Sequence, residues 1–241
     1  MLRAGARVAG LLLLFLVYLP PHLIAKMGGQ SPWPRRFLAA AARIAGVRAR
    51  VEGDPLEPHS LVIANHTSWL DILILGSATG AAFVSKDEVR TTPLIGWLAD
   101  QNHTVYIARA DRGDAHGHVR RVADGLARSQ PLAVFPEGTT GSGRSLLPFR
   151  STLLAAVAPA PAGARVRPVA IDYGQAVDGI AWINGESGID NALRVLARPG
   201  TIEVVVRLLR PLASSDRKAL AREASAAIAA ALSSVKGAAR L

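Results

Sequence analysis

The chain has 241 residues, of which 50% are hydrophobic, 19% charged and 5% aromatic, and its formal net charge is +10. This length suits one domain with or without an appendage, and the apolar content excludes a protein that is mainly disordered. Cysteine is absent, which excludes disulfide scaffolds, thiol nucleophiles and cysteine-bound zinc.

The positive charge is concentrated at the N-terminus. Residues 1–50 contain eight basic and no acidic residues, whereas the rest of the chain carries 20 basic and 18 acidic residues. A nucleic-acid-binding domain usually carries its basic stripe on the folded body. Because the excess charge here adjoins the most hydrophobic stretch, the sequence indicates a membrane surface as partner and no nucleic acid.

The first apolar segment, residues 8–25, has no formally charged side chain at neutral pH. We expect Pro20–Pro21 to break or kink a helix there. A cleaved signal peptide and a kinked transmembrane helix both fit this segment. The arginine-flanked amphipathic stretch 35–47 favours a third interpretation, in which two helices lie in one leaflet. Residues 1–50 are therefore predicted to be membrane-anchoring helices.

Residues 51–241 show short β-type runs that alternate with helical ones. Several strand-like runs are continuously apolar, as in strands covered on both faces. The alternation predicts an α/β domain with a mixed, mostly parallel sheet flanked by helices. The predicted strands are 48–52, 61–65, 82–85, 105–107, 133–135, 166–171 and 201–209. The predicted helices are 69–77, 93–99, 116–128, 149–158, 189–197 and 215–234.

A histidine and a carboxylate follow the second predicted strand. His66 and Asp71 stand on either side of a strand-to-helix turn, at the sheet edge where open α/β sheets bind ligands. If the carboxylate holds one imidazole nitrogen, the other nitrogen is free to remove a proton from a substrate hydroxyl. The pair alone also fits a structural role, with Asp71 in the first turn of a helix.

A second polar cluster, residues 136–140, follows the predicted strand 133–135. Gly138 permits a tight turn whose backbone N–H groups can hold an anion, and Glu137 is predicted to orient a hydroxyl or a cation. Arg109 ends another predicted strand and is suited to bidentate contact with phosphate. Alternatively, residues 136–140 form a simple turn with a surface glutamate, and Arg109 is a solvated charge.

These motifs, in this order, resemble the glycerolipid acyltransferase family that includes the 1-acylglycerol-3-phosphate O-acyltransferases. The matching residues are Asn65, His66, Asp71, Arg109, Phe135–Thr139 and Val166–Val169. The resemblance implies transfer of a fatty acyl group from acyl-CoA or acyl-carrier protein to a lysolipid hydroxyl, by a catalytic domain over residues 51–241. The family often has Asp or Asn before the arginine, where this chain has Ala108.

The resemblance also implies roles for individual residues. His66 is the general base and Asp71 its partner. The other implied site residues, which shape the acceptor site or stabilise the oxyanion, are Lys86, Arg109, Glu137, Gly138 and Thr139. No metal ion or cofactor is expected, and the active site is expected at the cytoplasmic face of the inner membrane.

Several alternatives stay open. The favoured acceptor is lysophosphatidic acid, giving phosphatidic acid, but a lyso-ornithine lipid or another lysolipid also fits, as does a catalytically silent lipid-binding protein. A hydrolase using Ser68 or Ser151 lacks a G-x-S-x-G motif. His116 and His118 have no evident partners for a metal. Residues 179–199 match no pattern with a role, and the oligomeric state is left open.

Overall fold

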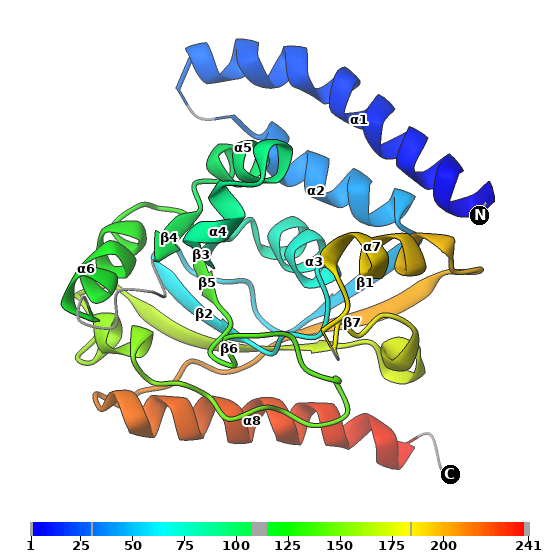
Figure 1. Ribbon diagram of the computed structural model, residues 1–241. Helices are drawn as coiled ribbons and strands as arrows, with labels where there is room; N and C mark the ends of the chain where they lie inside the picture. The colour runs from blue at the N-terminus through cyan, green and yellow to red at the C-terminus, as the bar shows by residue number, and fades with distance from the viewer. Residues whose placement is uncertain (1, 30, 108–114, 184, 239–241) are drawn as a thin grey trace.

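A seven-stranded sheet forms the centre of the protein (Figure 1). The computed structural model describes residues 2–29, 31–107, 115–183 and 185–238. In spatial order the strands are β1, β7, β6, β2, β5, β3 and β4. Their bounds in chain order are β1 Val47–Glu52, β2 Ser60–Ala64, β3 Ala82–Lys86, β4 Val105–Ile107, β5 Leu132–Val134, β6 Arg165–Asp172 and β7 Ile202–Leu208.

The sheet is mixed and mostly parallel, which confirms the predicted fold class. All pairs of neighbouring strands are parallel except β6 and β7. All seven predicted strands are present, with ends that differ by at most one residue. β1 begins at Val47, so the sheet starts within the segment predicted to be the anchor.

Helices cover both faces of this sheet (Figure 1). The helices are α1 Leu2–Met27, α2 Trp33–Ile44, α3 Leu70–Thr79, α4 Asp87–Arg90, α5 Pro93–Gln101, α6 Ala115–Leu126, α7 Gly188–Ala197 and α8 Arg217–Ala238. Two 3-10 helices, η1 Leu153–Val157 and η2 Gly174–Gly179, complete the set within the described residues. The short α4 and η2 were not predicted from the sequence.

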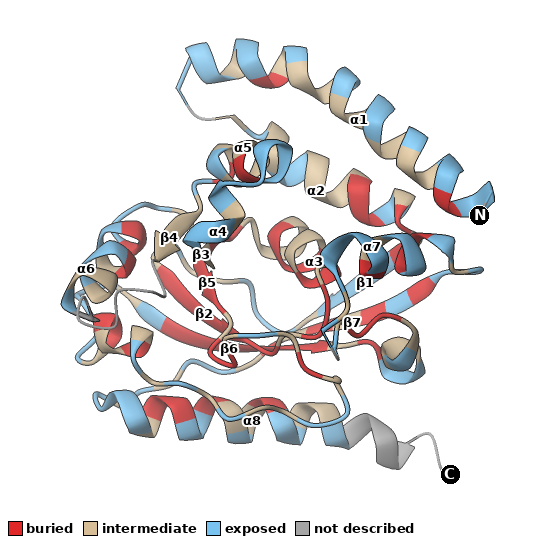
Figure 2. Ribbon diagram, viewed as in Figure 1, coloured by how far each residue is buried: buried red, intermediate tan, exposed pale blue. Residues whose placement is uncertain are grey.

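Alternate residues of β2 face two separate cores. Val62 and Ala64 pack with α2, α3 and α7, whereas Leu61 and Ile63 pack with α6, η1 and α8. All four side chains are fully buried, and Figure 2 shows the central strands as the most buried part of the protein. Burial on both faces is the reason why this strand has a continuously apolar sequence.

The predicted helix 149–158 is wrong, because only the 3-10 helix η1 forms in this segment. The backbone N–H of Leu147 donates to Glu137, and that of Arg150 donates to the carbonyl of Pro136. Both N–H groups therefore bond to the loop after β5, and they are not available for helical hydrogen bonds.

The predicted break at Pro20 and Pro21 is also wrong, because α1 continues through both prolines. Contacts at both ends hold this helix. Arg7 donates to the carbonyls of Leu196 and Arg198 at 3.0 Å each. Further along α1, Lys26 donates to Gln101 of α5, and His22 Nε2 lies 3.1 Å from the same oxygen. Each proline removes one backbone hydrogen bond, but its φ is compatible with a helix, and α1 stays helical through both.

Helix α1 is long and apolar enough to cross a membrane. It has 26 residues, a mean hydropathy of 2.1 over its most apolar window and little burial inside the protein. It lies antiparallel to α2 along one side of the molecule (Figure 1). Its length and composition suggest membrane association.

Candidate active site

The end of β2 is fixed to β6 by a buried asparagine. The Asn65 side-chain amide donates to the Ile171 carbonyl at 3.0 Å, and its oxygen accepts the Ile171 N–H at 2.8 Å. This double contact closes the gap between the two strands at their carboxyl ends. The residue that follows, His66, is thereby held at the sheet edge where we expected the site.

His66 and Asp71 are in contact. Nδ1 of His66 lies 2.8 Å from Oδ2 of Asp71, which also accepts the backbone N–H groups of Thr67 at 2.7 Å and Ser68 at 2.9 Å. Asp71 is fully buried in the first turn of α3, where the helix dipole favours a negative charge. An ionised Asp71 requires the ring proton on Nδ1, so Nε2 is left as a proton acceptor.

Tyr173 is a further partner of Asp71 that the sequence analysis missed. Its hydroxyl donates to Oδ1 of Asp71 at 2.5 Å. Burial and the neighbouring Asp71 carboxylate raise the pKa of Tyr173 well above its ordinary value, so the hydroxyl stays protonated and remains a donor. Both oxygens of Asp71 thus have fixed partners, which hold the carboxylate in one orientation.

Glu137 connects the His66 turn to the loop after β5. Oε1 accepts the His66 N–H at 2.7 Å, and Oε2 accepts the Leu147 N–H at 2.8 Å. Burial raises the pKa of Glu137, while these two hydrogen bonds and His66 act in the opposite direction. The expected contact of Glu137 with a hydroxyl or a cation is not what this geometry favours, because both oxygens already accept backbone hydrogen bonds.

Replacing Glu137 with glutamine is expected to lower both stability and activity. The amide NH2 would face one of the two backbone N–H groups, and a buried donor without a partner costs about 1–3 kcal/mol. Urea unfolding of Glu137→Gln measures the stability change, and a turnover assay measures the loss of activity. Glu203→Gln on the exposed side of β7 is the matched control, and equal stability of the two variants would contradict the role.

The ring of His66 also packs on aromatic side chains. It stacks on Phe135, with ring centroids 4.1 Å apart and an angle of 17° between the planes. The rings of Phe135 and Phe83 are also nearly parallel, with centroids 6.1 Å apart. Offset stacking of this kind adds about 0.5–1.5 kcal/mol beyond the area that it buries. The imidazole is therefore oriented by a carboxylate at its edge and an aromatic ring on its face.

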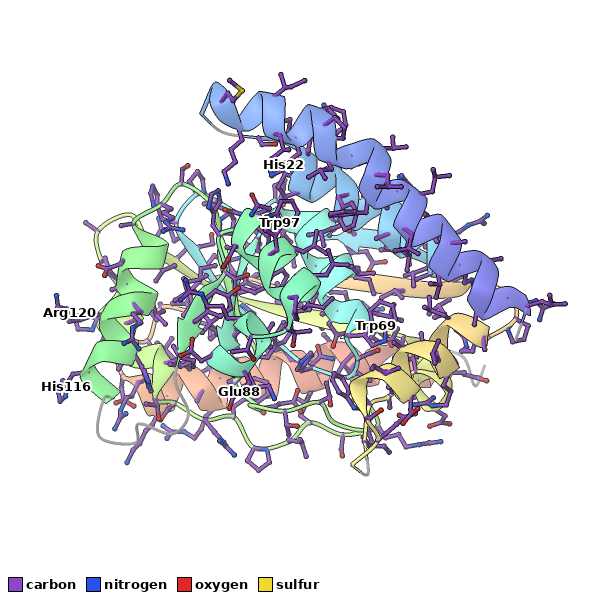
Figure 3. The ribbon with its side chains drawn as sticks, turned by 45° about the horizontal axis from the view of Figure 1, so that its top comes forward. His22, Trp69, Glu88, Trp97, His116 and Arg120 are labelled. Atoms are coloured by element: carbon purple, nitrogen blue, oxygen red, sulfur yellow. The ribbon has the colours of Figure 1, made fainter. Side chains whose placement is uncertain are left out.

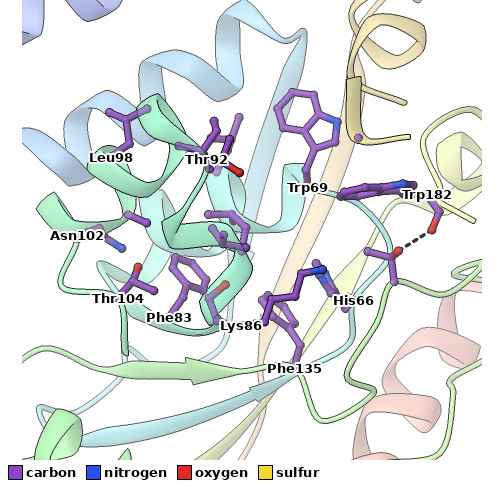
Figure 4. Close-up of a pocket in the computed structure, with 18 of the residues that line it drawn as sticks. His66, Trp69, Phe83, Lys86, Thr92, Leu98, Asn102, Thr104, Phe135 and Trp182 are labelled. Atoms are coloured by element: carbon purple, nitrogen blue, oxygen red, sulfur yellow. Dashed lines mark hydrogen bonds between the residues drawn. The ribbon is translucent and has the colours of Figure 1, made fainter. Parts of the chain in front are cut away.

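A large cavity opens beside His66, with a volume of about 1970 Å³. Its lining is mostly apolar, and α1, α2, α3, α5 and α7 each contribute side chains to it. Figure 4 shows some of the lining residues around His66. Lys86, Gly138 and Thr139 line it, as the sequence predicts for substrate-binding residues. Arg109 lies outside the described residues.

Three lining residues were missed by the sequence analysis. Arg150 lies against Gly138, where an added Cβ would be 3.5 Å from the guanidinium. Trp69 has a buried indole N–H without a hydrogen-bond partner among the described residues and lies between α7 and the helices α4 and α5 (Figure 3). Trp182 lies near Trp69 and His66 (Figure 4). An arginine after a loop and a lone tryptophan carry no distinctive sequence signal, so geometry alone identifies these residues.

His116 and His118 both lie in α6. Among the residues that the structure describes, no group of three or more His, Asp or Glu side chains is arranged to hold a metal ion. Ser68 donates its backbone N–H to Asp71 and accepts a long contact from Leu70. The first polar cluster is therefore organised around His66 and Asp71.

A family model described as Acyltransferase matches residues 48–172, slightly more than half of the chain. The chain belongs to the acyltransferase family. The matched range includes both members of the His66–Asp71 pair and the loop that contains Glu137. The resemblance drawn from the sequence motifs is thereby confirmed, and the protein is an acyltransferase of the lysolipid-acylating type.

Two relatives and one solved structure illustrate the range of this acyltransferase family. A lyso-ornithine lipid O-acyltransferase of Pseudomonas aeruginosa is 39% identical over 204 residues, 82% of this chain and 77% of the relative. A 1-acyl-sn-glycerol-3-phosphate acyltransferase of Neisseria gonorrhoeae is 38% identical over 124 residues, 50% of this chain and 48% of the relative. The crystal structure of the acyltransferase PlsC from Thermotoga maritima shares the fold, with a TM-score of 0.62, 23% identity, and coverage of 84% of this chain and 78% of that chain.

Proposed function

We propose that the protein transfers a fatty acyl group from acyl-CoA or acyl-carrier protein to the free hydroxyl of a lysolipid, with His66 as general base. The observation that carries this proposal is the contact between His66 Nδ1 and the buried Asp71 at the wall of an apolar cavity. That contact leaves Nε2 of His66 to accept a proton from a hydroxyl group bound in the cavity.

The reaction then proceeds in two proton transfers. His66 Nε2 removes the hydroxyl proton as the oxygen attacks the thioester carbonyl, and Asp71 stabilises the imidazolium that forms. The tetrahedral intermediate collapses with cleavage of the carbon–sulfur bond. His66 returns the proton to the departing thiolate, so the ester, the thiol and the neutral imidazole are the products.

Cationic groups in the cavity support the binding of negative charge. Among its described lining residues, Lys86 is the last residue of β3, and Arg150 lies against Gly138. We assign these groups to the oxyanion and to an anionic part of the acceptor, together with Arg109. Glu137 does not contact the substrate in this proposal. It positions the His66 turn against the loop after β5.

A lyso-ornithine lipid is the acceptor that we favour. The Pseudomonas aeruginosa relative named for this substrate matches 82% of the chain, whereas the Neisseria gonorrhoeae relative named for a glycerol phosphate matches 50%. Ornithine has a carboxylate that an arginine can bind in place of phosphate, and Ala108 departs from the pattern before Arg109. Lysophosphatidic acid is the second candidate, because Lys86 and Arg150 also suit a phosphate group.

An acceptor assay distinguishes the two lipids. Purified protein is given lyso-ornithine lipid or lysophosphatidic acid, each with acyl-carrier-protein and CoA donors of the same chain length. We expect the higher kcat/KM with the lyso-ornithine lipid. A higher kcat/KM with lysophosphatidic acid would overturn the choice of acceptor while keeping the reaction, and His66→Ala serves as the background control.

The membrane position follows from the same substrates. We place α1 and α2 in the interface of one leaflet, because α1 lies along the folded body and Arg7 is bonded to the end of α7. Acyl-CoA and acyl-carrier protein are cytoplasmic donors, and positive flanking charge is typical of the cytoplasmic side. The active site is therefore proposed to face the cytoplasmic side of the inner membrane.

A further inference from the structure

Helix α7 exposes large aliphatic side chains where a surface helix normally exposes polar ones. Val195 and Leu196 on its inner face are buried, and Asn191 beside them is buried too. On its outer face Ile189 is 74% exposed and Leu193 is 47% exposed. Scattered single apolar residues are ordinary on a surface, but Ile189 and Leu193 are one helical turn apart and form one stripe.

This stripe lies at the mouth of the catalytic cavity. Ile189 and Leu193 both line the cavity and are exposed, as is Ile183, which precedes α7 and is 38% exposed. Ile95 of α5 lines the cavity as well and is 51% exposed. Both α5 and α7 therefore contribute aliphatic side chains that line the cavity and are also exposed.

The stripe is continuous with the apolar helix α1. The Arg7 guanidinium of α1 is bonded to the carbonyls of Leu196 and Arg198 at the end of α7. The side chains of Leu12, Leu13, Leu16 and Val17 on α1 are more than half exposed. Arg7 and Arg198, where α1 meets the end of α7, add positive charge that favours anionic lipid headgroups.

The segment that carries the stripe is also fixed to the His66 turn. The backbone N–H of Trp182 donates to the Thr67 carbonyl at 3.0 Å, and the Trp182 carbonyl accepts the Thr140 hydroxyl at 2.5 Å. Arg194 in the last turn of α7 forms an ion pair with Glu186, which precedes the helix in the same segment as Trp182. The position of α7 relative to the imidazole is therefore set by direct hydrogen bonds.

We propose that Ile183 and the outer face of α7 form a second lipid-contacting element, which with α1 and α5 sets the mouth of the cavity in the membrane surface. An amphiphile in the leaflet then reaches His66 without its acyl chain crossing water, so the chain keeps the favourable burial of its methylene groups throughout. Delivery of the acceptor from the leaflet to His66 rests on the proposed function. The contact of α7 with lipid does not depend on which acceptor is used.

Because the chain has no cysteine, single cysteines can report the depth of each position. Full-length Ile189→Cys and Leu193→Cys variants are labelled with a nitrobenzoxadiazole fluorophore and reconstituted in vesicles of phosphatidylethanolamine and phosphatidylglycerol. Leu16→Cys on α1 and Ala230→Cys on the exposed side of α8 are the comparison sites; α8 lies on the opposite side of the molecule from α1 (Figure 1). Quenching is measured with a nitroxide-labelled lipid and with aqueous iodide.

We expect the nitroxide lipid to quench the labels at positions 189 and 193, and iodide to quench the label at 230. Quenching at 189 and 193 by iodide with no effect of the nitroxide lipid overturns the proposal, whatever the result at position 16, and indicates water or a protein partner on this face. The readout does not depend on turnover. An acceptor other than a lysolipid would therefore leave this result unchanged, and the two proposals fail separately.

A pair of charges on the stripe provides a second measurement. Ile189→Asp combined with Leu193→Asp is expected to lose activity toward a lysolipid embedded in vesicles, because each carboxylate opposes insertion into lipid. Ala230→Asp on α8 introduces the same residue at an exposed helical position and is expected to keep that activity. Equal activity of the two variants, with both folded by circular dichroism, overturns the proposal.

Discussion

Replacing His66 with alanine is expected to reduce kcat by about 10²–10⁴-fold or more, the usual contribution of a general base. The imidazole would be the only group that carries the proton in both steps of the proposed reaction, first from the hydroxyl and then to the thiolate. Its ring also fills the space beside Phe135, so the fold of the variant is checked by circular dichroism and thermal unfolding.

The sharpest form of this experiment separates kcat from KM. His66 lines the cavity beside the proposed site of the reacting atoms, whereas most of the cavity wall is apolar and distant from them. The variant should therefore keep a KM close to that of the unmodified protein. Turnover near the original value in a folded variant would exclude His66 as the base.

Replacing Asp71 with asparagine is expected to lower kcat on the order of 10⁴-fold, as loss of the carboxylate does in a histidine–aspartate pair of this geometry. The asparagine has no charge to stabilise the imidazolium. Its carbonyl oxygen is expected to take the place of Oδ2, where it accepts the backbone N–H groups of Thr67 and Ser68, so the contact with Nδ1 is kept and the charge alone is lost. Turnover of Asp71→Asn measures the effect directly.

Tyr173→Phe is the matched comparison for Asp71→Asn. It keeps the contact of Oδ2 with His66 and removes only the hydroxyl that donates to Oδ1. Losing a hydrogen bond to a buried charged group costs about 1.5–3 kcal/mol, so we expect a smaller loss of kcat than in Asp71→Asn. A loss as large as that of Asp71→Asn would show that orientation of the carboxylate matters more than its charge.

The contact between His66 and Asp71 was accessible from the sequence because both residues belong to one local turn. The hydrophobic run that ends at Ala64 places the turn at the carboxyl edge of the sheet, and five residues span the return into α3. Tyr173 was not accessible, because it is 102 residues from Asp71 in the chain. Only the register between β2 and β6 brings its hydroxyl to the carboxylate.

The errors in the predicted helices have a common physical origin. The break at Pro20–Pro21 and the helix at 149–158 were both predicted from local propensity. Contacts with distant residues act on the backbone of both segments. Contacts with α7 and α5 hold α1 at both ends, and the Arg150 N–H donates to the Pro136 carbonyl in place of a helical partner. Tertiary contacts routinely override propensity in this way.

Asn65 has a consequence beyond closing the sheet edge. Its amide grips both backbone groups of Ile171, and Tyr173 is two residues further along the same chain. By fixing the backbone of Ile171, Asn65 therefore also fixes the distance between the Tyr173 hydroxyl and the Asp71 carboxylate. Asn65 thus helps to align Tyr173, Asp71 and His66, although its own side chain does not contact the reacting atoms.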